Sequence, residues 1–301
     1  MVSENDVTSS RNLDHCVLPT AHLAVARERL KTLGFTVAPD AAHPFGTGNC
    51  CVFFKDGSYL EPLSRVDPKV AREAEEAGNV FVKRDQEFRK VFGDEGFSAV
   101  VLGTDDADED HERFVDGGIS AGDPLSFSRP FRDASGKEAT ASFRLAFAAP
   151  KDADGHFFFT CQRVNLPSGG RGALETHLNG VTGTARIILL AASPETHAGF
   201  LKRFSGASPE PVQGDGLDLP LGNAVLTVMT LERYKADLGL DRAAPHGQLD
   251  LAAIVFQCPD IAGLRSHLSM QAVLYAEDDG RIIVPPAAGQ GAVFVFEESS
   301  P

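Results

Sequence analysis

The stretch LDHCVLPTAH, residues 13–22, predicts a buried strand that runs into the start of a helix. Beyond it, apolar residues recur at helical spacing from Leu23 to Leu33, so one face of that helix is expected to lie on a sheet. His15 interrupts the apolar run, although a hydrophobic residue would pack there at lower cost. The stretch therefore predicts a β-α unit that carries one buried polar side chain.

The same pattern occurs four times along the chain. Each copy has an apolar strand, a turn, an amphipathic helix and then β-rich sequence with glycine turns, which predicts a βαβββ module. The first strands are HCVLPTAH from 15, AVVLGTDD from 99, RIILLAAS from 186 and AIVFQCPD from 253. A helix-period segment, 67–91, connects the first two copies. The Gly- and Pro-rich stretch 163–180 favours a division into two domains of two modules each, 1–165 and 166–301.

Length and charge narrow the class of protein. The 301 residues suffice for two domains of roughly 150 residues. A net charge of −14 disfavours binding to nucleic acid or to an anionic membrane, so we expect a small-molecule ligand. The sequence has neither a secretory leader pattern nor a spanning segment, and its five cysteines form no CxxC pair. We expect a cytoplasmic protein with reduced thiols, either a monomer or a homodimer.

Several short motifs follow one another in a fixed order. They are LDH at 13–15, LGF at 33–35, HPFGTGN at 43–49, YLE at 59–61, HLNG at 177–180 and GAVFVFE at 291–297. Together they resemble the glyoxalase-like proteins of bacteria, within the vicinal oxygen chelate (glyoxalase/bleomycin resistance/extradiol dioxygenase) superfamily. The resemblance implies an α+β fold in which four βαβββ modules form two cup-shaped half-barrels. It also implies that His15 and Glu61 point into one cup, because that superfamily holds a divalent metal with a His from the first strand and a Glu from the last strand of each module.

Only the first module keeps both of these residues. At the place of His15 the other modules have Ala99, Arg186 and Ala253. Counting four residues from the turn glycine puts Phe159 and Val295 at the place of Glu61 in the second and fourth modules, and the third module has no clear counterpart. Two protein ligands rarely hold a metal tightly, so the usual ligand set is incomplete.

Three alternatives follow for the histidine. If the first module pairs with the fourth, Glu297 lies one pleat beyond Val295 and joins His15 and Glu61 as a ligand for Zn, Ni, Fe or Mn. If the first module pairs with the second, the cup can receive His156, Cys161 or Gln162. Without a metal, His15 and Glu61 either form a buried hydrogen bond with each other or contact a small polar ligand.

Two functions fit these observations. In one, a metal-dependent lyase, isomerase or dioxygenase relative polarises vicinal oxygens at His15 and Glu61, and Glu61 also serves as the catalytic base. In the other, a metal-free cup sequesters a small organic molecule, as the resistance proteins of the superfamily do. The third metal ligand distinguishes the two.

Five further residues are candidates for the ligand pocket. His43 and Asn49 can lie at its mouth, and Arg186 can clamp a carboxylate or phosphate of a ligand. Gln162 and His177 complete the set. For the HPFGTGN and HLNG motifs, an ordinary turn is the structural alternative.

Overall fold

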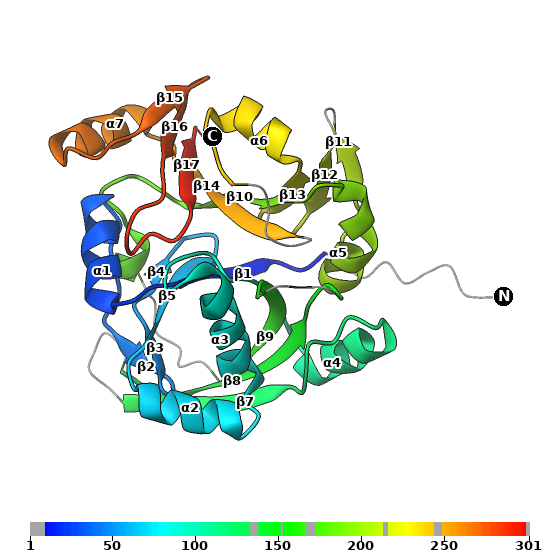
Figure 1. The fold of residues 1–301 in the computed structure, drawn as a ribbon. Helices are drawn as coiled ribbons and strands as arrows, with labels where there is room; N and C mark the ends of the chain where they lie inside the picture. The colour runs from blue at the N-terminus through cyan, green and yellow to red at the C-terminus, as the bar shows by residue number, and fades with distance from the viewer. Residues whose placement is uncertain are drawn as a thin grey trace.

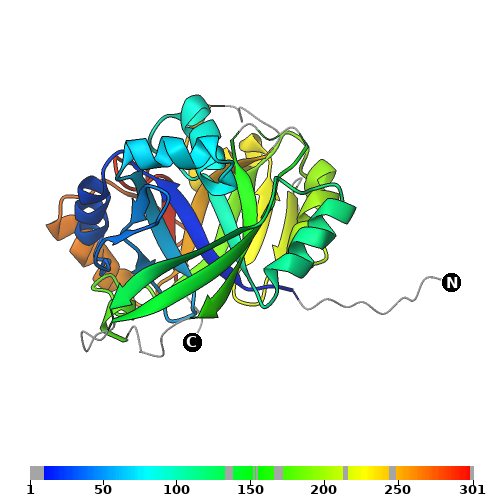
Figure 2. The same ribbon diagram turned by 90° about the horizontal axis from the view of Figure 1, so that it is seen from below.

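A computed structural model describes residues 10–132, 138–151, 153, 155–165, 172–212, 216–243 and 249–298. Their strands form two strongly curved sheets, and helices lie on both faces of each sheet (Figures 1 and 2). The fold is α+β and consists of four βαβββ modules in two cup-shaped half-barrels, as predicted. No helix among these residues is long and apolar enough to cross a membrane.

The first sheet has nine strands, in the order β2-β3-β5-β1-β6-β9-β8-β7 with β4 beside β5. Its strands are β1 (Leu13–Pro19), β2 (Ala41–Ala42), β3 (Thr47–Asn49), β4 (Val52–Phe53), β5 (Tyr59–Arg65), β6 (Ala99–Thr104), β7 (Leu125–Arg132), β8 (Glu138–Ala148) and β9 (Phe157–Asn165). The first module pairs with the second, because β1 and β6 run antiparallel side by side. The alternative pairing of the first module with the fourth is therefore wrong.

The second sheet has eight strands, in the order β11-β12-β13-β10-β14-β17-β16-β15. Its strands are β10 (Gly183–Leu190), β11 (Glu210–Val212), β12 (Gly216–Pro220), β13 (Val225–Met229), β14 (Asp250–Gln257), β15 (Ala276–Asp278), β16 (Arg281–Val284) and β17 (Val293–Glu297). It repeats the plan of the first sheet, with the first strands of modules three and four antiparallel at its centre.

One helix of each module covers the outer face of its sheet. These helices are α1 (Leu23–Thr32), α4 (Ala107–Asp116), α5 (Ala198–Ser205) and α7 (Ile261–Met270), and a short 3₁₀ turn, η2 (Pro194–His197), precedes α5. A second short 3₁₀ turn, η1 (Gly172–Glu175), lies between the two halves of the sequence. The helices contact one another across the halves: the Phe114 and Phe204 rings lie 6.1 Å apart, and His267 Nε2 lies 3.1 Å from the Thr32 carbonyl oxygen. One hydrophobic core consequently runs through both halves.

Side chains of β1 alternate between two environments, as a pleated strand requires. Cys16 and Leu18 point into the shared core under the outer helices. Val17 belongs to a separate cluster on the concave face, and His15 lies on that face one pleat before it. The concave face of the first sheet is called the first cup below, and that of the second sheet the second cup.

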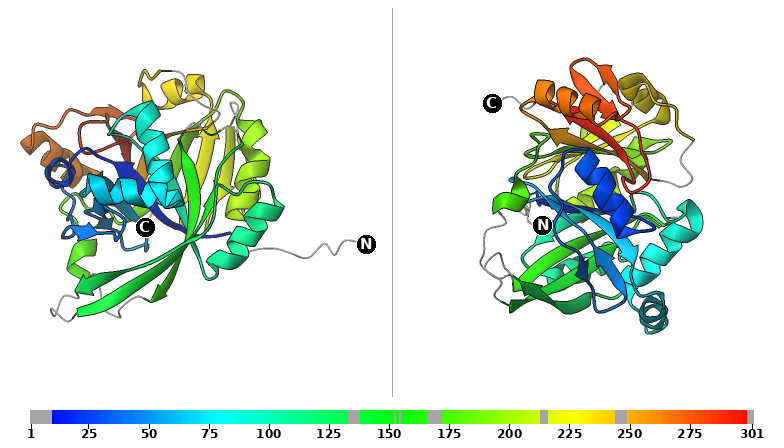
Figure 3. Two further views of the ribbon diagram at one scale, coloured as in Figure 1. Left: turned by 60° about the horizontal axis from the view of Figure 1, so that its bottom comes forward. Right: turned by 90° about the vertical axis from the view of Figure 1, so that its left-hand side faces the viewer.

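The predicted helical segment 67–91 forms two helices, α2 (Pro68–Glu76) and α3 (Val80–Phe92). Gly78 separates them with φ +88°, and the Asn79 side chain accepts a hydrogen bond from Val82 N at the start of α3. Both helices lie against the first cup (Figures 1 and 3). In the second half the corresponding connection contains α6 (Leu231–Leu238), which packs against the second cup.

Candidate functional site

His15 and Glu61 meet in the first cup because β1 and β5 pair in parallel. His15 Nε2 lies 3.3 Å from Glu61 Oε2, and His15 Nδ1 lies 2.7 Å from Asp14 Oδ1. Asn49 Nδ2 donates to Glu61 Oε1 at 2.6 Å. All four side chains are buried. Each nitrogen of the imidazole therefore faces a carboxylate.

Aromatic rings and one guanidinium enclose this group. The Tyr59 ring stacks on His15 with the ring centres 4.4 Å apart, and the edge of Phe159 approaches at 5.5 Å. Arg163 Nη2 lies 2.6 Å from Asp14 Oδ2. Positive and negative groups thus alternate along the network, which lowers the cost of burying each of them.

The charges of the pair follow from these contacts. Burial lowers the pKa of His15, but the hydrogen bonds and charges of Asp14 and Glu61 outweigh burial and raise it above the usual value. Burial raises the pKa of Glu61, but the contacts with His15, and those with His43 and Asn49, lower it to about 2. The contacts therefore favour the charged forms of both His15 and Glu61.

His43 and Asn49, expected at the mouth of a pocket, are buried parts of the same network. His43 Nδ1 lies 2.9 Å from Thr47 Oγ1, and its Nε2 lies 3.3 Å from Asn49 Nδ2. Burial lowers the pKa of His43 to about 4, so this ring is neutral at pH 7. Its Nδ1–H donates to the threonine and its Nε2 accepts from the amide.

The second module supplies no metal donor at the matching positions of the first cup. In the parallel pair of β6 and β9, Val101 lies opposite Phe159, as Val17 lies opposite Glu61 in the first module. Phe159 thus occupies the place of Glu61, and Ala99 that of His15. Among the residues that the structure describes, no three or more His, Cys, Asp or Glu side chains are placed to hold a metal ion. The donor set of the first cup does not fit a resident metal.

Helix α3 fills the space above these positions. The Phe81 ring lies 5.9 Å from Phe159 and 6.3 Å from Phe157, in one apolar cluster with residues of α2 and of the concave face. Buried Asp85 fixes the helix, because Arg65 donates to it at 3.1 Å and Arg89 at 2.9 Å. The first cup is therefore a packed core in this structure.

The second cup differs from the first at its centre. Arg186 lies opposite Val225 in the parallel pair of β10 and β13, and Ile188 opposite Thr227. Thr227 is therefore the counterpart of Glu61 in the third module. The spacing from the turn glycine did not predict this counterpart. Thr227 lies five residues after Gly222, whereas the interval is four in the other modules.

Glu297, expected beside His15 and Glu61 in one pairing, lies on β17 in the second sheet. It lines a cavity of about 130 Å³ in the second cup, together with Arg186 and Arg281. The structure therefore does not bring Glu297 to the His15–Glu61 pair. A His-Glu-Glu metal site is not formed.

Gln162 and His177 form hydrogen bonds to other parts of the protein. Gln162 Oε1 accepts from Ala107 N at 3.2 Å, and its Nε2 donates to Asp105 O at 2.6 Å, so Gln162 holds the start of α4. His177 Nδ1 accepts from Thr36 N at 3.0 Å, and Nε2 lies 3.0 Å from Phe53 O. The HLNG turn therefore connects the second half to the first.

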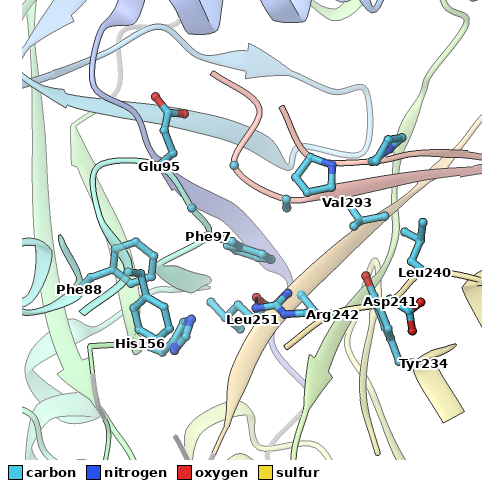
Figure 4. A pocket seen from close by; sticks show the side chains of 17 residues that line it. Phe88, Glu95, Phe97, His156, Tyr234, Leu240, Asp241, Arg242, Leu251 and Val293 are labelled. Carbon is cyan, nitrogen blue, oxygen red and sulfur yellow. Dashed lines mark hydrogen bonds between the residues drawn. The ribbon is translucent and has the colours of Figure 1, made fainter. Parts of the chain in front are cut away.

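A larger cavity, of about 330 Å³, lies between the two halves (Figure 4). The end of α3, the loop before β6, helix α6 and strands β14 and β17 surround it. Its walls are mainly apolar and aromatic, and its polar side chains are Glu95, His156, Tyr234, Asp241 and Arg242. No local sequence pattern indicates this cavity, because its residues come from segments that only the docking of the two halves brings together.

The polar end of this cavity is organised around a buried acid. Asp250 is 2% exposed; its Oδ1 lies 3.9 Å from His156 Nδ1, and its Oδ2 lies 3.8 Å from Arg242 Nη2. Burial raises the pKa of Tyr234, against the charge of Arg242. His156, which one alternative placed in the first cup, packs instead on the rings of Phe88 and Phe92 at the cavity wall.

Comparison with known proteins identifies the family. The family model of the glyoxalase-like domain matches residues 13–204. A comparison with curated proteins gives no match.

Solved structures share the fold over nearly the whole chain. A hypothetical protein from Staphylococcus aureus has a TM-score of 0.64 at 11% identity and covers 95% of this chain and 99% of its own. A variant of 4-hydroxymandelate synthase from Streptomyces coelicolor has a TM-score of 0.57 at 14% identity, covering 98% and 94%. The Mn(II)-bound glyoxalase from Novosphingobium aromaticivorans has a TM-score of 0.55 at 8% identity, covering 96% and 82%. The chain belongs to the glyoxalase-like domain family.

Proposed function

We propose that this protein binds a small organic molecule without a resident metal ion, in the cavity between its two halves. The observation that carries the proposal is the cavity itself. Its volume of about 330 Å³ falls within the ~300–1,000 Å³ of typical ligand sites, and its apolar walls surround a few convergent polar groups. The alternative of a metal-dependent lyase or isomerase has less support, because Ala99 and Phe159 of the second module stand at the positions of His15 and Glu61.

The lining indicates the kind of ligand. Phe88, Phe92 and Phe97 offer flat apolar surface, which suits a planar or compact hydrophobic body. Arg242 donates to the Leu251 carbonyl at 3.4 Å and stands 3.8 Å from Asp250, which leaves donors of its planar fork for a ligand. The Tyr234 hydroxyl can donate to the same group. A small aromatic carboxylate combines both features.

The experiment uses three probes: benzoate, 1-naphthoate and cyclohexanecarboxylate. Binding to the purified full chain is measured by ligand-observed NMR and calorimetry. We expect at least one aromatic probe to bind. Ala292 lines the cavity, so Ala292→Leu should occupy part of the cavity and abolish that binding. Ala262→Leu, on the exposed face of α7, should not change it. Absence of binding by all three probes, or equal binding by both variants, would refute the proposal.

Metal content is measured on the same preparation, purified without chelator. We expect far less than one metal ion per chain, before and after incubation with Zn, Ni, Fe or Mn. Near-stoichiometric metal that disappears in a His15→Ala, Glu61→Ala double variant would overturn the metal-free assignment and favour the enzyme alternative.

A further inference from the structure

The second cup contains a cavity of its own, of about 130 Å³, which shares no lining residue with the cavity between the halves. Its floor is apolar and includes Met229, Leu238 and Val255. At this size it is well below the ~300 Å³ of sites for drug-sized ligands, so it suits a molecule of only a few non-hydrogen atoms.

The cavity lies at the centre of the cup. Arg186 stands where the first module has His15, and Val295 stands where the first module has Glu61, by the register of their strand pairs. A guanidinium thus replaces an imidazole at this point. Leu238 of α6 and Arg186 line the same space.

Arg186 is the less neutralised of the two cations in the lining. Its Nη1 donates to Thr227 Oγ1 at 3.3 Å, and the nearest carboxylate oxygen, Asp218 Oδ2, is 3.9 Å away. Thr227 in turn donates to Asp218 Oδ1 at 2.5 Å, which engages that acid. Arg281 differs, because it donates to Asp278 Oδ2 at 2.6 Å.

An acid of opposite charge lines the same cavity. Glu297 lies at the end of β17, opposite Gln257, and is partly exposed. Within the described part of the chain, Glu297 makes no ion pair within 4.0 Å, either with Arg186 or with another cation. Asp237, the other acid of the lining, pairs with Arg233 at 3.4 Å. Arg186 and Glu297 therefore line one small cavity without neutralising each other directly.

We infer that this cavity binds a small zwitterion, an α-amino acid with a short apolar side chain. The ligand carboxylate bonds to the planar fork of Arg186, the ligand ammonium bonds to Glu297, and the side chain lies on the apolar floor. A ligand with both charges can pair with Arg186 and with Glu297. A simple carboxylate can pair only with Arg186, and its uncharged end would lie against the Glu297 carboxylate.

The test titrates the full chain with glycine, L-alanine and L-valine by calorimetry and by amide chemical shifts. Propionate, which lacks the ammonium group, and propylamine, which lacks the carboxylate, serve as matched probes. We expect L-alanine or L-valine to bind at least tenfold more tightly than either of these. If no amino acid binds, or if propionate binds as tightly, the inference is wrong.

Variants assign the two charges. Arg186→Gln and Glu297→Gln should each weaken amino-acid binding at least tenfold, and Arg186→Lys, which keeps the charge but loses the fork, should retain part of the affinity. Arg265→Gln removes an exposed arginine paired with Glu277 and should change nothing. Unchanged binding in both glutamine variants, with circular dichroism confirming that they are folded, would contradict the inference. Binding of naphthoate in the other cavity is independent of this result.

Discussion

The resemblance implies a metal ligand at His15, but the ring nitrogens of His15 face Asp14 and Glu61. Arg163 neutralises the first of these acids and Asn49 donates to the second. Asp14, His15 and Glu61 therefore each have a partner of opposite sign or a hydrogen-bond donor. The His15 ring is thus held by side chains of the chain itself.

Replacing His15 by glutamine should remove a pH-dependent stabilisation. The contacts with Asp14 and Glu61 raise the pKa of His15 above 6.5, so the folded chain binds this proton more tightly than the unfolded chain does. The stabilisation is fully present below about pH 6.5 and is lost as the pH rises through the folded pKa. Urea unfolding of wild type and His15→Gln should therefore show a stability difference that shrinks above that pH. A difference independent of pH would contradict the ion pair.

Replacing His43 should have the opposite pH dependence. Its folded pKa is about 4, whereas the unfolded ring titrates near 6.5, so protonation favours unfolding as the pH falls between these values. The wild type loses up to about 3 kcal/mol in this window, and His43→Gln does not. The stability of wild type relative to His43→Gln, measured by urea unfolding at pH 7, 5.5 and 4, should fall toward acid. If it rises instead, His43 is charged in the folded protein.

Helix α3 determines what the first cup can hold. Phe81 and Val82 pack on its concave face in one apolar cluster with Phe159. The helix is fixed at its middle by Asp85, which Arg65 and Arg89 both contact. The same connection in the second half, α6, leaves a cavity open beside Leu238.

Asp85→Asn tests how firmly α3 is held. The substitution leaves the buried guanidinium of Arg89 without its carboxylate, which costs about 3–5 kcal/mol of unfolding free energy. Asp94→Asn is the matched control, because Asp94 contacts Arg89 at 3.3 Å from an exposed position and is worth less than about 1 kcal/mol. Chemical denaturation of both variants measures these costs. Similar costs for the two would mean that Asp85 does not anchor the helix.

The elements themselves were largely predictable from the sequence, but their partners were not. The four first strands are apolar runs followed by helical periodicity, and each is found as a central strand. The segment 67–91 was predicted to be helical. Periodicity shows that a helix has an apolar face, but it does not show which surface of the protein that face packs against. Module pairing was also undecided, because sequence separation gave no reason to prefer β6 over β14 beside β1.

The candidate site was predictable only where the resemblance supplied a motif. LDH and YLE led to the contact between His15 and Glu61. Asp14 precedes His15 in the same motif. Because neighbouring residues of a strand point to opposite faces, the sequence pattern did not predict the hydrogen bond between the Asp14 carboxylate and the His15 ring. The cavity between the halves left no local signal at all, because residues such as His156 and Arg242 come together only when the two halves dock.

The two halves share one hydrophobic core. Phe35, from the first half, lies 6.1 Å from Phe54 in its own half, and 5.5 Å from Phe256 and 6.2 Å from Phe296 in the other. The cavity between the halves exists only while this contact holds. Ligand binding there should therefore stabilise both halves together.

A shared core predicts a single cooperative unfolding transition for the full chain. Phe35→Ala removes a buried ring between the halves and should cost about 3–5 kcal/mol, and it should lower the melting temperature of both halves as one unit. Scanning calorimetry should give a calorimetric enthalpy equal to the van't Hoff enthalpy in wild type and variant, and native-state hydrogen exchange should show equal losses of protection in β1 and β14. Two separate transitions in the wild type, or a loss of protection confined to β1, would mean that the halves fold independently. The cavity would then depend on docking of two preformed domains, and its ligand would bind at a mobile interface rather than in a fixed part of one core.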